Sequence, residues 1–550
     1  MPVSKTLCLC ILCATGSLAD RIGVATPLIH TVVTTQCNLY QDWQVLALYW
    51  TWQRVGSPGL FTRIAACSMS QILNRAAFDP CPVYYTEDTP DPEHTGDSYS
   101  PFNKPWGLRS WLEHAKPEGD YFLLLDADMT FHRSFTVEEF GVRAGWGAAQ
   151  NMWYMADLNR FMAEKMMPPD TPIYDDWLAA PFTARRADEV GEFFLYHEAD
   201  IKRLAPLYWD YSIKARTFHE RHAGELPPGT PADRPWIAEM YGGAMAAAAA
   251  GVRHYGQNST VWHPPGYPGN EGVPWLVSHY AWNAEAPNTH LKWNKHTYRG
   301  FTALRCPPWH LDQLQTVEAW DTTYNISAGG MFDHPPRPSL LTTTGRELLK
   351  DLANIEMVAL ANEAFCELHH LRRCPPSPEL DRECGMAKQV VSELVDRYLE
   401  LEGLTDGNIY CMDDKVEVCK AKLRPIDGGK AEWSCQDEPA NRECQQTCGV
   451  CPPKHPLLDS TWYRLEYRAR QKRQAERKAA QERQQAASDL AAQQADGEGA
   501  AEAQHAEQYQ SLISIIDFVA ASTEHHYIRM GETHPVNHGE LLNQLAMTEM

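Results

Sequence analysis

Apolar runs and amphipathic stretches alternate along the N-terminal part of the chain. Runs rich in β-branched and aromatic residues at 28–36 ("LIHTVVTTQ"), 63–68 ("RIAACS") and 121–131 ("YFLLLDADMTF") predict strands. Between them, 41–55 and 103–115 have the length and the apolar spacing of helices. Strands and helices that alternate at this spacing predict an α/β fold with a parallel sheet.

Downstream, the pattern changes several times. A Pro-rich stretch at 331–342 precedes a helical pattern at 344–404, then six closely spaced cysteines, then an Ala-, Gln-, Glu- and Arg-rich tail. We therefore expect five segments: a signal peptide at 1–19, an α/β domain at 20–342, a helical extension at 343–405, a cysteine-rich domain at 406–453 and a charged tail, helical or disordered, at 454–550.

The first residues have the pattern of a secretory signal. Lys5 precedes an apolar run at 6–15, and Ser17-Leu18-Ala19 has the small-x-small form of a cleavage site. No later stretch is long and apolar enough to predict a membrane span. We expect cleavage after Ala19 and a mature chain in the lumen of the endoplasmic reticulum or Golgi, or secreted.

An oxidising compartment changes how the cysteines are interpreted. Three of the 16 cysteines precede residue 20, which leaves thirteen, mostly disulfide candidates. Because thirteen is odd, at least one thiol is free or pairs with another chain. Asn258-Ser-Thr and Asn325-Ile-Ser are then candidate glycosylation sites.

The amino-acid composition limits the classes of partner that the chain can bind. The formal net charge of −22 argues against nucleic acid, whose phosphates require a basic surface. The 18 tryptophans suit core packing for the most part, and stacking on sugar rings for some.

Asp126 and Asp128 directly follow the apolar run "YFLLL". Ligands of open parallel sheets bind beyond the carboxyl ends of the strands, where these carboxylates would lie. Carboxylate oxygens suit Mg²⁺ or Mn²⁺, which commonly share phosphate oxygens as ligands. The pattern predicts a metal-assisted site for a nucleotide diphosphate; the alternative is an exposed turn.

Four other residues are weaker candidates for the same site. His279 follows an apolar run and suits Mn²⁺ better than Mg²⁺, although a lone histidine is more often structural. Lys104 is a candidate phosphate contact or a solvated surface lysine. Thr34 and Thr35, at the end of the first predicted strand, are candidate donor contacts.

Several motifs follow the order found in the peptidyl serine α-galactosyltransferases. They are "DADMTF" (126–131), "GEFFLYHEADIKRLAPLYWDYS" (191–212), "RPWIAEMYGGAMAAA" (234–248), "HPPGYP" (263–268), "SHY" (278–280) and "RCPPWHL" (305–311). From about His30 to about Arg337 the chain resembles this family and the related hydroxyproline O-arabinosyltransferases. The resemblance implies a GT-A-type fold, a UDP-galactose donor, Mn²⁺ (or Mg²⁺), and transfer, with the α configuration retained, to serine in hydroxyproline-rich, extensin-like proteins.

The resemblance also implies residue roles. Asp126 and Asp128 fill the metal-binding motif, and His279 matches the histidine after the late strand. Glu239, in "PWIAEMYGG", is the candidate catalytic carboxylate near the anomeric carbon, where it would stabilise an oxocarbenium-like transition state or attack it. Its alternatives are Asp175 and Asp176, which could equally contact the acceptor.

The six-cysteine segment resembles an ShK-toxin-like domain at both ends, with a longer spacing in the middle. The resemblance implies the pairs Cys411–Cys451, Cys419–Cys444 and Cys435–Cys448. A zinc cluster is the alternative, and an oxidising lumen disfavours it.

Two other functions remain open at this point. One is transfer of arabinose to hydroxyproline. The other is a non-catalytic secretory protein that binds Pro-rich chains, which the intact Asp126 and Asp128 weigh against.

Overall fold

The computed structural model of the chain describes residues 27–75, 79, 81–87, 99–171, 186–222, 224–226, 235–266, 273–286, 289, 291–311, 313–319, 322–327, 329–404, 409–410 and 456–495. The chain divides into two compact units, one up to Tyr467 and one from Arg468 onward. The sheet and the candidate site lie in the first unit.

The largest sheet has seven strands in the order β3-β2-β1-β4-β7-β6-β8. These strands are β1 (Ile29–Gln36), β2 (Leu60–Ala66), β3 (Val83–Thr86), β4 (Tyr121–Leu125), β6 (Trp146–Asn151), β7 (Val190–His197) and β8 (Arg253–Gln257). Three small sheets contain β5 (Met129–Phe131), β9 (Val261–Trp262) and β10 (Val277–His279); β11 (Ala284–Ala286) and β12 (Leu291–Trp293); and β13 (Leu314–Ala319) and β14 (Thr322–Ser327).

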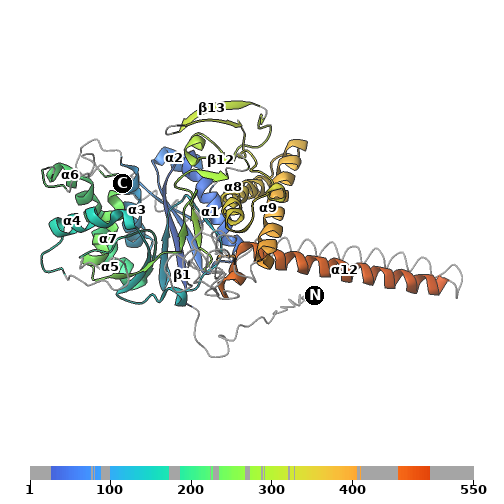
Figure 1. The fold of residues 1–550 in the computed structure, drawn as a ribbon, viewed down its shortest axis with the longest axis horizontal. Coiled ribbons are helices and arrows are strands. Elements are labelled where there is room, and N and C mark those ends of the chain that lie inside the picture. Colours follow the sequence, from blue (N-terminus) through green and yellow to red (C-terminus); the bar gives the residue numbers. More distant parts are fainter. Residues whose placement is uncertain are drawn as a thin grey trace, which may run out of the picture. The chain divides into compact units, whose positions relative to one another are not determined.

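Helices cover both faces of the large sheet (Figure 1). Among the described residues up to Leu404, the α-helices are α1 (Leu39–Arg54), α2 (Met69–Arg75), α3 (Asn103–His114), α4 (Ala156–Met166), α5 (Glu198–Arg216), α6 (Phe218–Arg221), α7 (Ala238–Ala249), α8 (Gly345–Leu371) and α9 (Pro378–Leu404). In Figure 1, α3, α5 and α7 lie on one side of the sheet, and α1, α8 and α9 on the other. The helix α12 (Trp462–Ala495) begins in the first unit and continues in the second.

The strand β4 shows why its apolar run is continuous. Phe122 and Leu124 belong to the core with α3, α5 and α7, whereas Leu123 and Leu125 belong to the core with α1 and α8. A strand buried on both faces needs apolar residues at every position. This confirms the predicted α/β class with helices flanking a mostly parallel sheet.

The third predicted strand is two strands. The run 121–131 forms β4 up to Leu125, and β5 then begins at Met129 in a different sheet. The sheet is also mixed: β7 runs antiparallel to both β4 and β6, and the other four neighbour pairings are parallel. The break after Leu125 turns the Asp126–Asp128 segment out of the sheet.

The helical pattern predicted at 344–404 is confirmed as α8 and α9. The helices are joined by the disulfide Cys366–Cys384, and Cys374 links their connection to Cys306. The side chains of α8 share one core with those of α1. The helical extension therefore packs directly on the α/β part.

A third disulfide, Cys37–Cys67, links the ends of β1 and β2. Disulfide pairing was the predicted role of most cysteines. Within the described ranges, Cys81 is a buried free thiol. The pairings predicted for Cys411–Cys451, Cys419–Cys444 and Cys435–Cys448 lie outside the described residues, and so does the predicted signal peptide.

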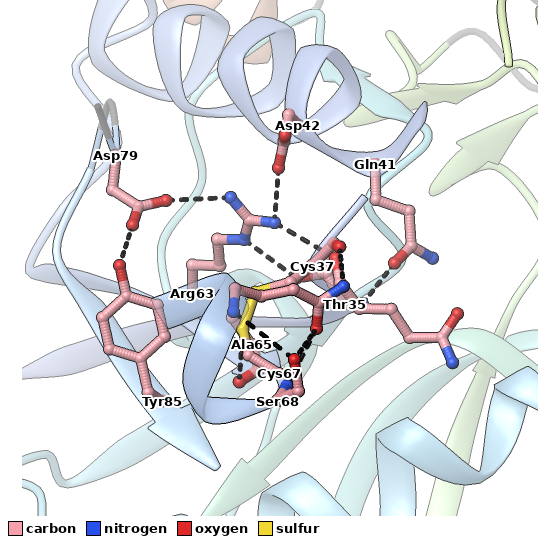
Figure 2. The surroundings of a disulfide bond; sticks show 12 residues. Thr35, Cys37, Gln41, Asp42, Arg63, Ala65, Cys67, Ser68, Asp79 and Tyr85 are labelled. Carbon is pink, nitrogen blue, oxygen red and sulfur yellow. Dashed lines mark hydrogen bonds and ion pairs between the residues drawn. A yellow bond between two sulfur atoms is a disulfide. The ribbon is translucent and has the colours of Figure 1, made fainter. Parts of the chain in front are cut away.

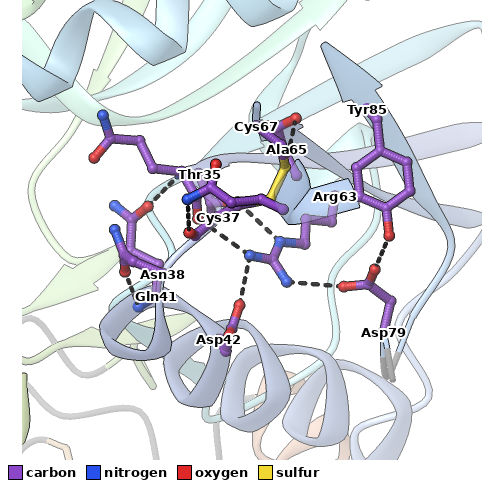
Figure 3. A network of polar contacts seen from close by, with 12 residues as sticks. Thr35, Cys37, Asn38, Gln41, Asp42, Arg63, Ala65, Cys67, Asp79 and Tyr85 are labelled. Carbon is purple, nitrogen blue, oxygen red and sulfur yellow. Dashed lines mark hydrogen bonds and ion pairs between the residues drawn. A yellow bond between two sulfur atoms is a disulfide. The ribbon is translucent and has the colours of Figure 1, made fainter. Parts of the chain in front are cut away.

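Beside the Cys37–Cys67 disulfide, a buried arginine ties β1, β2 and α1 together (Figure 2). Arg63 of β2 donates from Nε to Thr35 Oγ1 at 2.8 Å and pairs with Asp42 at 2.8 Å and Asp79 at 3.0 Å. Figure 3 shows the guanidinium between the two carboxylates. At the start of α1, Asn38 caps the helix by accepting from the backbone N–H of Gln41. These contacts fix the carboxyl end of β1, which borders the candidate site.

None of the helices in the described ranges combines the length and the apolar character needed to cross a membrane.

Candidate active site

A cavity of 1560 Å³ opens at the carboxyl ends of β1 and β4. Its lining includes the predicted residues Thr34, Lys104, Asp126, Asp128, Glu239 and His279. These residues are separated by up to 245 positions in the sequence, and they meet at the sheet edge where α/β proteins bind ligands.

The pairing of β5 with β10 brings Asp128 to His279. Met129 lies opposite His279 in this antiparallel pair, and Tyr280 N–H donates to the Asp128 carbonyl at 3.1 Å. One ligand atom each from Asp126, Asp128 and His279 lies within 4.8 Å of the others. Donors around one divalent cation, each about 2.1 Å from it, lie up to about 4.2 Å apart, so a small movement of the side chains would bring all three groups onto one ion. Two carboxylates and an imidazole therefore fit a Mn²⁺ or Mg²⁺ ion.

Cationic side chains surround Asp128. Lys295, on the 3₁₀ helix η6 (Lys295–Tyr298), forms an ion pair with the carboxylate, and His279 Nε2 lies 3.3 Å from its Oδ2. Burial alone would raise the pKa of Asp128, but these two cations hold it well below its usual range. Burial would lower the pKa of His279, yet Asp128 and Glu192 raise it to about 10. Asp128 is thus a carboxylate throughout the neutral range.

Lys104 connects the metal-binding motif to Glu239. Its Nζ lies 2.5 Å from Asp126 Oδ1 and 3.4 Å from Glu239 Oε1. Burial opposes the ammonium charge, but Asp126 and Glu239 raise the pKa of Lys104 well above its ordinary value. On the other side of Glu239, Tyr99 O–H donates to Oε2 at 2.7 Å. Burial raises the pKa of Glu239, and Lys104 and Tyr99 partly offset the effect.

A fourth carboxylate, Glu192 of β7, joins Asp126, Asp128 and Glu239 in the cavity lining. Glu192 is buried, and its Oε2 lies 2.6 Å from His263 Nε2 and 3.1 Å from His279 Nδ1. The three residues offer a second set of ligand atoms within 4.8 Å of one another. Burial opposes the charge of Glu192, but the two histidines hold its pKa far below the ordinary value.

The remaining predicted site residues are placed differently. Thr34 lines the cavity, and within the described part of the chain its buried hydroxyl has no hydrogen-bond partner. Thr35 instead accepts from Arg63 and donates to the Ile64 carbonyl, away from the lining. Asp175 and Asp176 lie outside the described residues.

Both predicted glycosylation sites are exposed. Asn325 lies on β14, and Asn258 lies at the cavity lining, where its Oδ1 accepts from Asn151 at 2.7 Å. A glycan on Asn258 would therefore stand next to the cavity.

Sequence reasoning missed Glu192, His263, Lys295 and Tyr99. Glu192 and His263 both lie within the motifs that carry the resemblance. Their presence in these motifs was the one feature of the sequence that could have identified them as site residues. A glutamate inside a strand and a histidine before two prolines have no chemical signature by themselves. The stretches of sequence that contain Lys295 and Tyr99 have no chemical signature either.

Known proteins resemble this chain over the same region. Residues 29–255 match the sequence model described as HPAT: Hydroxyproline O-arabinosyltransferase family N-terminal domain. The chain is 31% identical over 463 residues to the peptidyl serine alpha-galactosyltransferase of Chlamydomonas reinhardtii, covering 79% of this chain and 57% of that protein. It is 28% identical over 375 residues to the protein of the same name from Arabidopsis thaliana, covering 68% and 42%.

These matches confirm the resemblance predicted from the motifs. The chain spans about half the length of the curated relatives it matches. Among solved structures, the galactosyltransferase LgtC in complex with donor and acceptor sugar analogues is similar at 14% identity, with 47% of this chain and 88% of that chain covered and a TM-score of 0.28. A TM-score this low supports no conclusion about the site.

Proposed function

We propose that the chain is a glycosyltransferase that moves galactose from UDP-galactose to serine hydroxyls of hydroxyproline-rich, extensin-like proteins, with the α configuration retained. The observation that carries the proposal is the cluster of Asp126, Asp128 and His279 beside two lysines and Glu239, in a chain 31% identical to a peptidyl serine alpha-galactosyltransferase. A divalent cation, Mn²⁺ or Mg²⁺, held by the cluster would neutralise charge that builds up on the leaving diphosphate.

The two lysines have the positions to share that task. Lys104 contacts Asp126 and Lys295 contacts Asp128, so a diphosphate bound at these carboxylates lies within reach of both ammonium groups. The raised pKa of Lys104 keeps it charged at neutral pH. The hydroxyl of Thr34, which has no hydrogen-bond partner among the described residues, offers a hydrogen bond to the nucleotide part of the donor.

Glu239 is the proposed catalytic carboxylate. Lys104 binds one of its oxygens and Tyr99 the other, so the side chain is fixed at the cavity wall. A fixed carboxylate at the anomeric carbon would stabilise positive charge that develops there. Asp175 and Asp176 remain the alternatives for this role.

Exposed aromatic side chains support an extended, proline-rich acceptor. Trp236, Trp282 and Tyr154 line the cavity and are 69%, 52% and 45% exposed. Flat aromatic faces are the surfaces on which proline-type rings of extended peptides pack. The acidic balance of the chain fits a protein acceptor better than nucleic acid.

A location in the lumen of the endoplasmic reticulum or Golgi, or outside the cell, completes the proposal. Three disulfides in the described ranges support an oxidising compartment.

One observation favours a second donor. The sequence model that matches residues 29–255 is named for hydroxyproline O-arabinosyltransferases. Arabinose transfer to hydroxyproline is therefore the alternative activity, and the same metal cluster would serve it.

The deciding experiment offers the purified full chain UDP-galactose or UDP-arabinose, with a peptide that contains serine next to four hydroxyprolines. We expect galactose on serine. Asp128→Asn should lower the rate by about 10²–10³-fold, because charge on the leaving group loses its partner. Asp381→Asn, at an exposed position of α9, is the matched control and should be active.

EDTA should abolish transfer by the wild-type chain, and Mn²⁺ should restore it. Full activity in EDTA would refute the metal-dependent mechanism. Arabinose on hydroxyproline would establish the alternative donor, and binding of the peptide with no transfer from any UDP-sugar would indicate a binding protein.

A further inference from the structure

Glu192 has a backbone conformation that is costly for its residue type. Its φ is +62°, in the left-handed region that glycine adopts freely and residues with a Cβ avoid. It lies where the pairing of β6 with β7 shifts register, since Ala149 faces Phe194 but Gln150 faces Gly191. Such bulges re-aim side chains next to functional sites.

The bulge aims a buried carboxylate at an imidazole that also contacts Asp128. Glu192 Oε2 lies 3.1 Å from His279 Nδ1, while His279 Nε2 lies 3.3 Å from Asp128 Oδ2. The imidazole thus stands between two carboxylates, one on each ring nitrogen. Glu192 itself is held on both oxygens: His263 Nε2 is 2.6 Å from Oε2, and Tyr154 O–H donates to Oε1 at 3.3 Å.

We propose that Glu192 is a positioning residue for His279. The carboxylate 3.1 Å from Nδ1 favours a proton on that nitrogen, so Nε2 would be the nitrogen that gives up its proton and offers its lone pair to a cation beside Asp126 and Asp128. It also fixes the ring plane and makes Nε2 more basic, as carboxylates behind ligating histidines do. His263 in turn holds Glu192. The inference rests on the proposed metal-dependent function and adds a residue outside the set of three ligands.

A rival arrangement uses the same atoms differently. Glu192, His263 and His279 have ligand atoms close enough for one cation, and such a site would withdraw His279 from Asp128. The contacts favour positioning, because both imidazoles approach the same oxygen, Oε2, at hydrogen-bonding distances. The two arrangements predict opposite effects of changing Asp128 and His263.

Mn²⁺ binding to the full chain in the presence of UDP tests the proposal, with free Mn²⁺ measured by electron paramagnetic resonance. Glu192→Gln keeps the shape of the side chain and removes its charge. We expect its dissociation constant for Mn²⁺ to rise by about 10–100-fold. Tyr154→Phe removes the hydroxyl that contacts Oε1 and is the matched control, with an expected change below about twofold, since Oε2 keeps its charge and its partners. Thermal melting checks that each variant is folded.

Glu192→Asn is the second variant if the glutamine fails to fold, because asparagine tolerates the left-handed conformation. It should weaken Mn²⁺ binding at least as much. Wild-type Mn²⁺ affinity in a folded Glu192→Gln or Glu192→Asn protein overturns the positioning role.

Asp128→Asn separates this inference from the proposed function. If Asp128→Asn loses Mn²⁺ and Glu192→Gln binds it like the wild type, only the inference fails. If the wild-type chain and Asp128→Asn bind Mn²⁺ alike, or neither binds it, the metal-dependent function fails and the inference with it. Tight 1:1 binding of Zn²⁺ that survives Asp128→Asn but not His263→Ala would overturn positioning in favour of a separate cation site.

Discussion

Glu239 is fixed from both sides by groups of different chemistry. The ammonium of Lys104 favours its charged form, while the hydroxyl of Tyr99 orients the second oxygen. Burial acts in the opposite direction and raises the pKa of the carboxyl. A carboxylate so held needs no reorganisation during the reaction, which is the condition under which electrostatic stabilisation is strong.

Glu239→Gln should therefore lower kcat much more than it changes KM for the UDP-sugar. The amide keeps the size of the side chain but cannot stabilise positive charge at the anomeric carbon, and we expect a loss of about 10²–10³-fold in kcat. Steady-state transfer and acceptor-free hydrolysis of the UDP-sugar, measured on the same variant, check the result.

Tyr99→Phe is the control, because it removes the hydroxyl contacts to Glu239 and to the Trp236 carbonyl but leaves the charge of Glu239, so its loss should be smaller. If Glu239→Gln hydrolyses UDP-sugar at the wild-type rate and only the KM for the acceptor rises, Glu239 binds the acceptor and the catalytic role passes to Asp175 or Asp176.

At the scale of elements, periodicity predicted three of the seven strands of the large sheet and two of the helices that flank it. The runs at 28–36 and 63–68 overlap β1 and β2, and the helices at 41–55 and 103–115 overlap α1 and α3. It did not predict the break after Leu125, because Met129–Phe131 continues the same apolar pattern. Only the pairing of β5 with the distant β10 shows that a new sheet begins there.

Local sequence patterns do not reveal contacts between distant segments, and this explains which site residues were predicted. Asp126 and Asp128 could be predicted because a local pattern, a buried strand followed by two acids, has a chemical meaning. Glu192 and Lys295 come from other parts of the chain, and their role depends on contacts across 87 residues to His279 and 167 residues to Asp128. A single sequence does not encode such pairings in any short pattern.

The elements that border the cavity depend on Arg63. Its buried guanidinium joins β2 to Thr35 of β1, to Asp42 of α1 and to Asp79. Arg63→Met should destabilise the fold by about 3–5 kcal/mol, because the two carboxylates stay buried without their cation. Thermal and urea unfolding measure the change.

Arg109→Met is the comparison for Arg63→Met. Arg109 forms a partly exposed ion pair with Glu113 at 3.0 Å on α3, and such pairs contribute about 0–1 kcal/mol. Equal small effects of the two substitutions would show that the Arg63 network does not hold the sheet edge.

At the scale of the whole first unit, polar groups as well as apolar ones join the α/β part to α8 and α9. His132, just after β5, lies 2.9 Å from Glu356 of α8, and Tyr398 of α9 donates to the same carboxylate at 2.6 Å. All three side chains are fully buried. The helices α8 and α9 therefore belong to the same packed structure as the cavity. A loss of their stability should also affect the candidate site.

Within that structure, His369 of α8 is buried and should make the stability depend on pH. It packs on Trp309 with ring centroids 4.9 Å apart, and its Nδ1 lies 3.7 Å from the sulfur of Cys374. Burial lowers the pKa of His369 from 6.5 to about 4. The unfolded chain therefore takes up this proton at a higher pH than the folded chain does.

As pH falls from about 6.5 to about 4, the folded state should lose up to about 3 kcal/mol through this residue, and above pH 7 the residue has no such effect. His369→Gln cannot take up the proton, so its melting temperature should fall less than that of the wild type between pH 7.5 and pH 5. His370→Gln, at the exposed neighbouring position, should follow the wild-type curve. Parallel melting curves for wild type and His369→Gln over this range would show that His369 is protonated in the folded chain, against the effect of its burial.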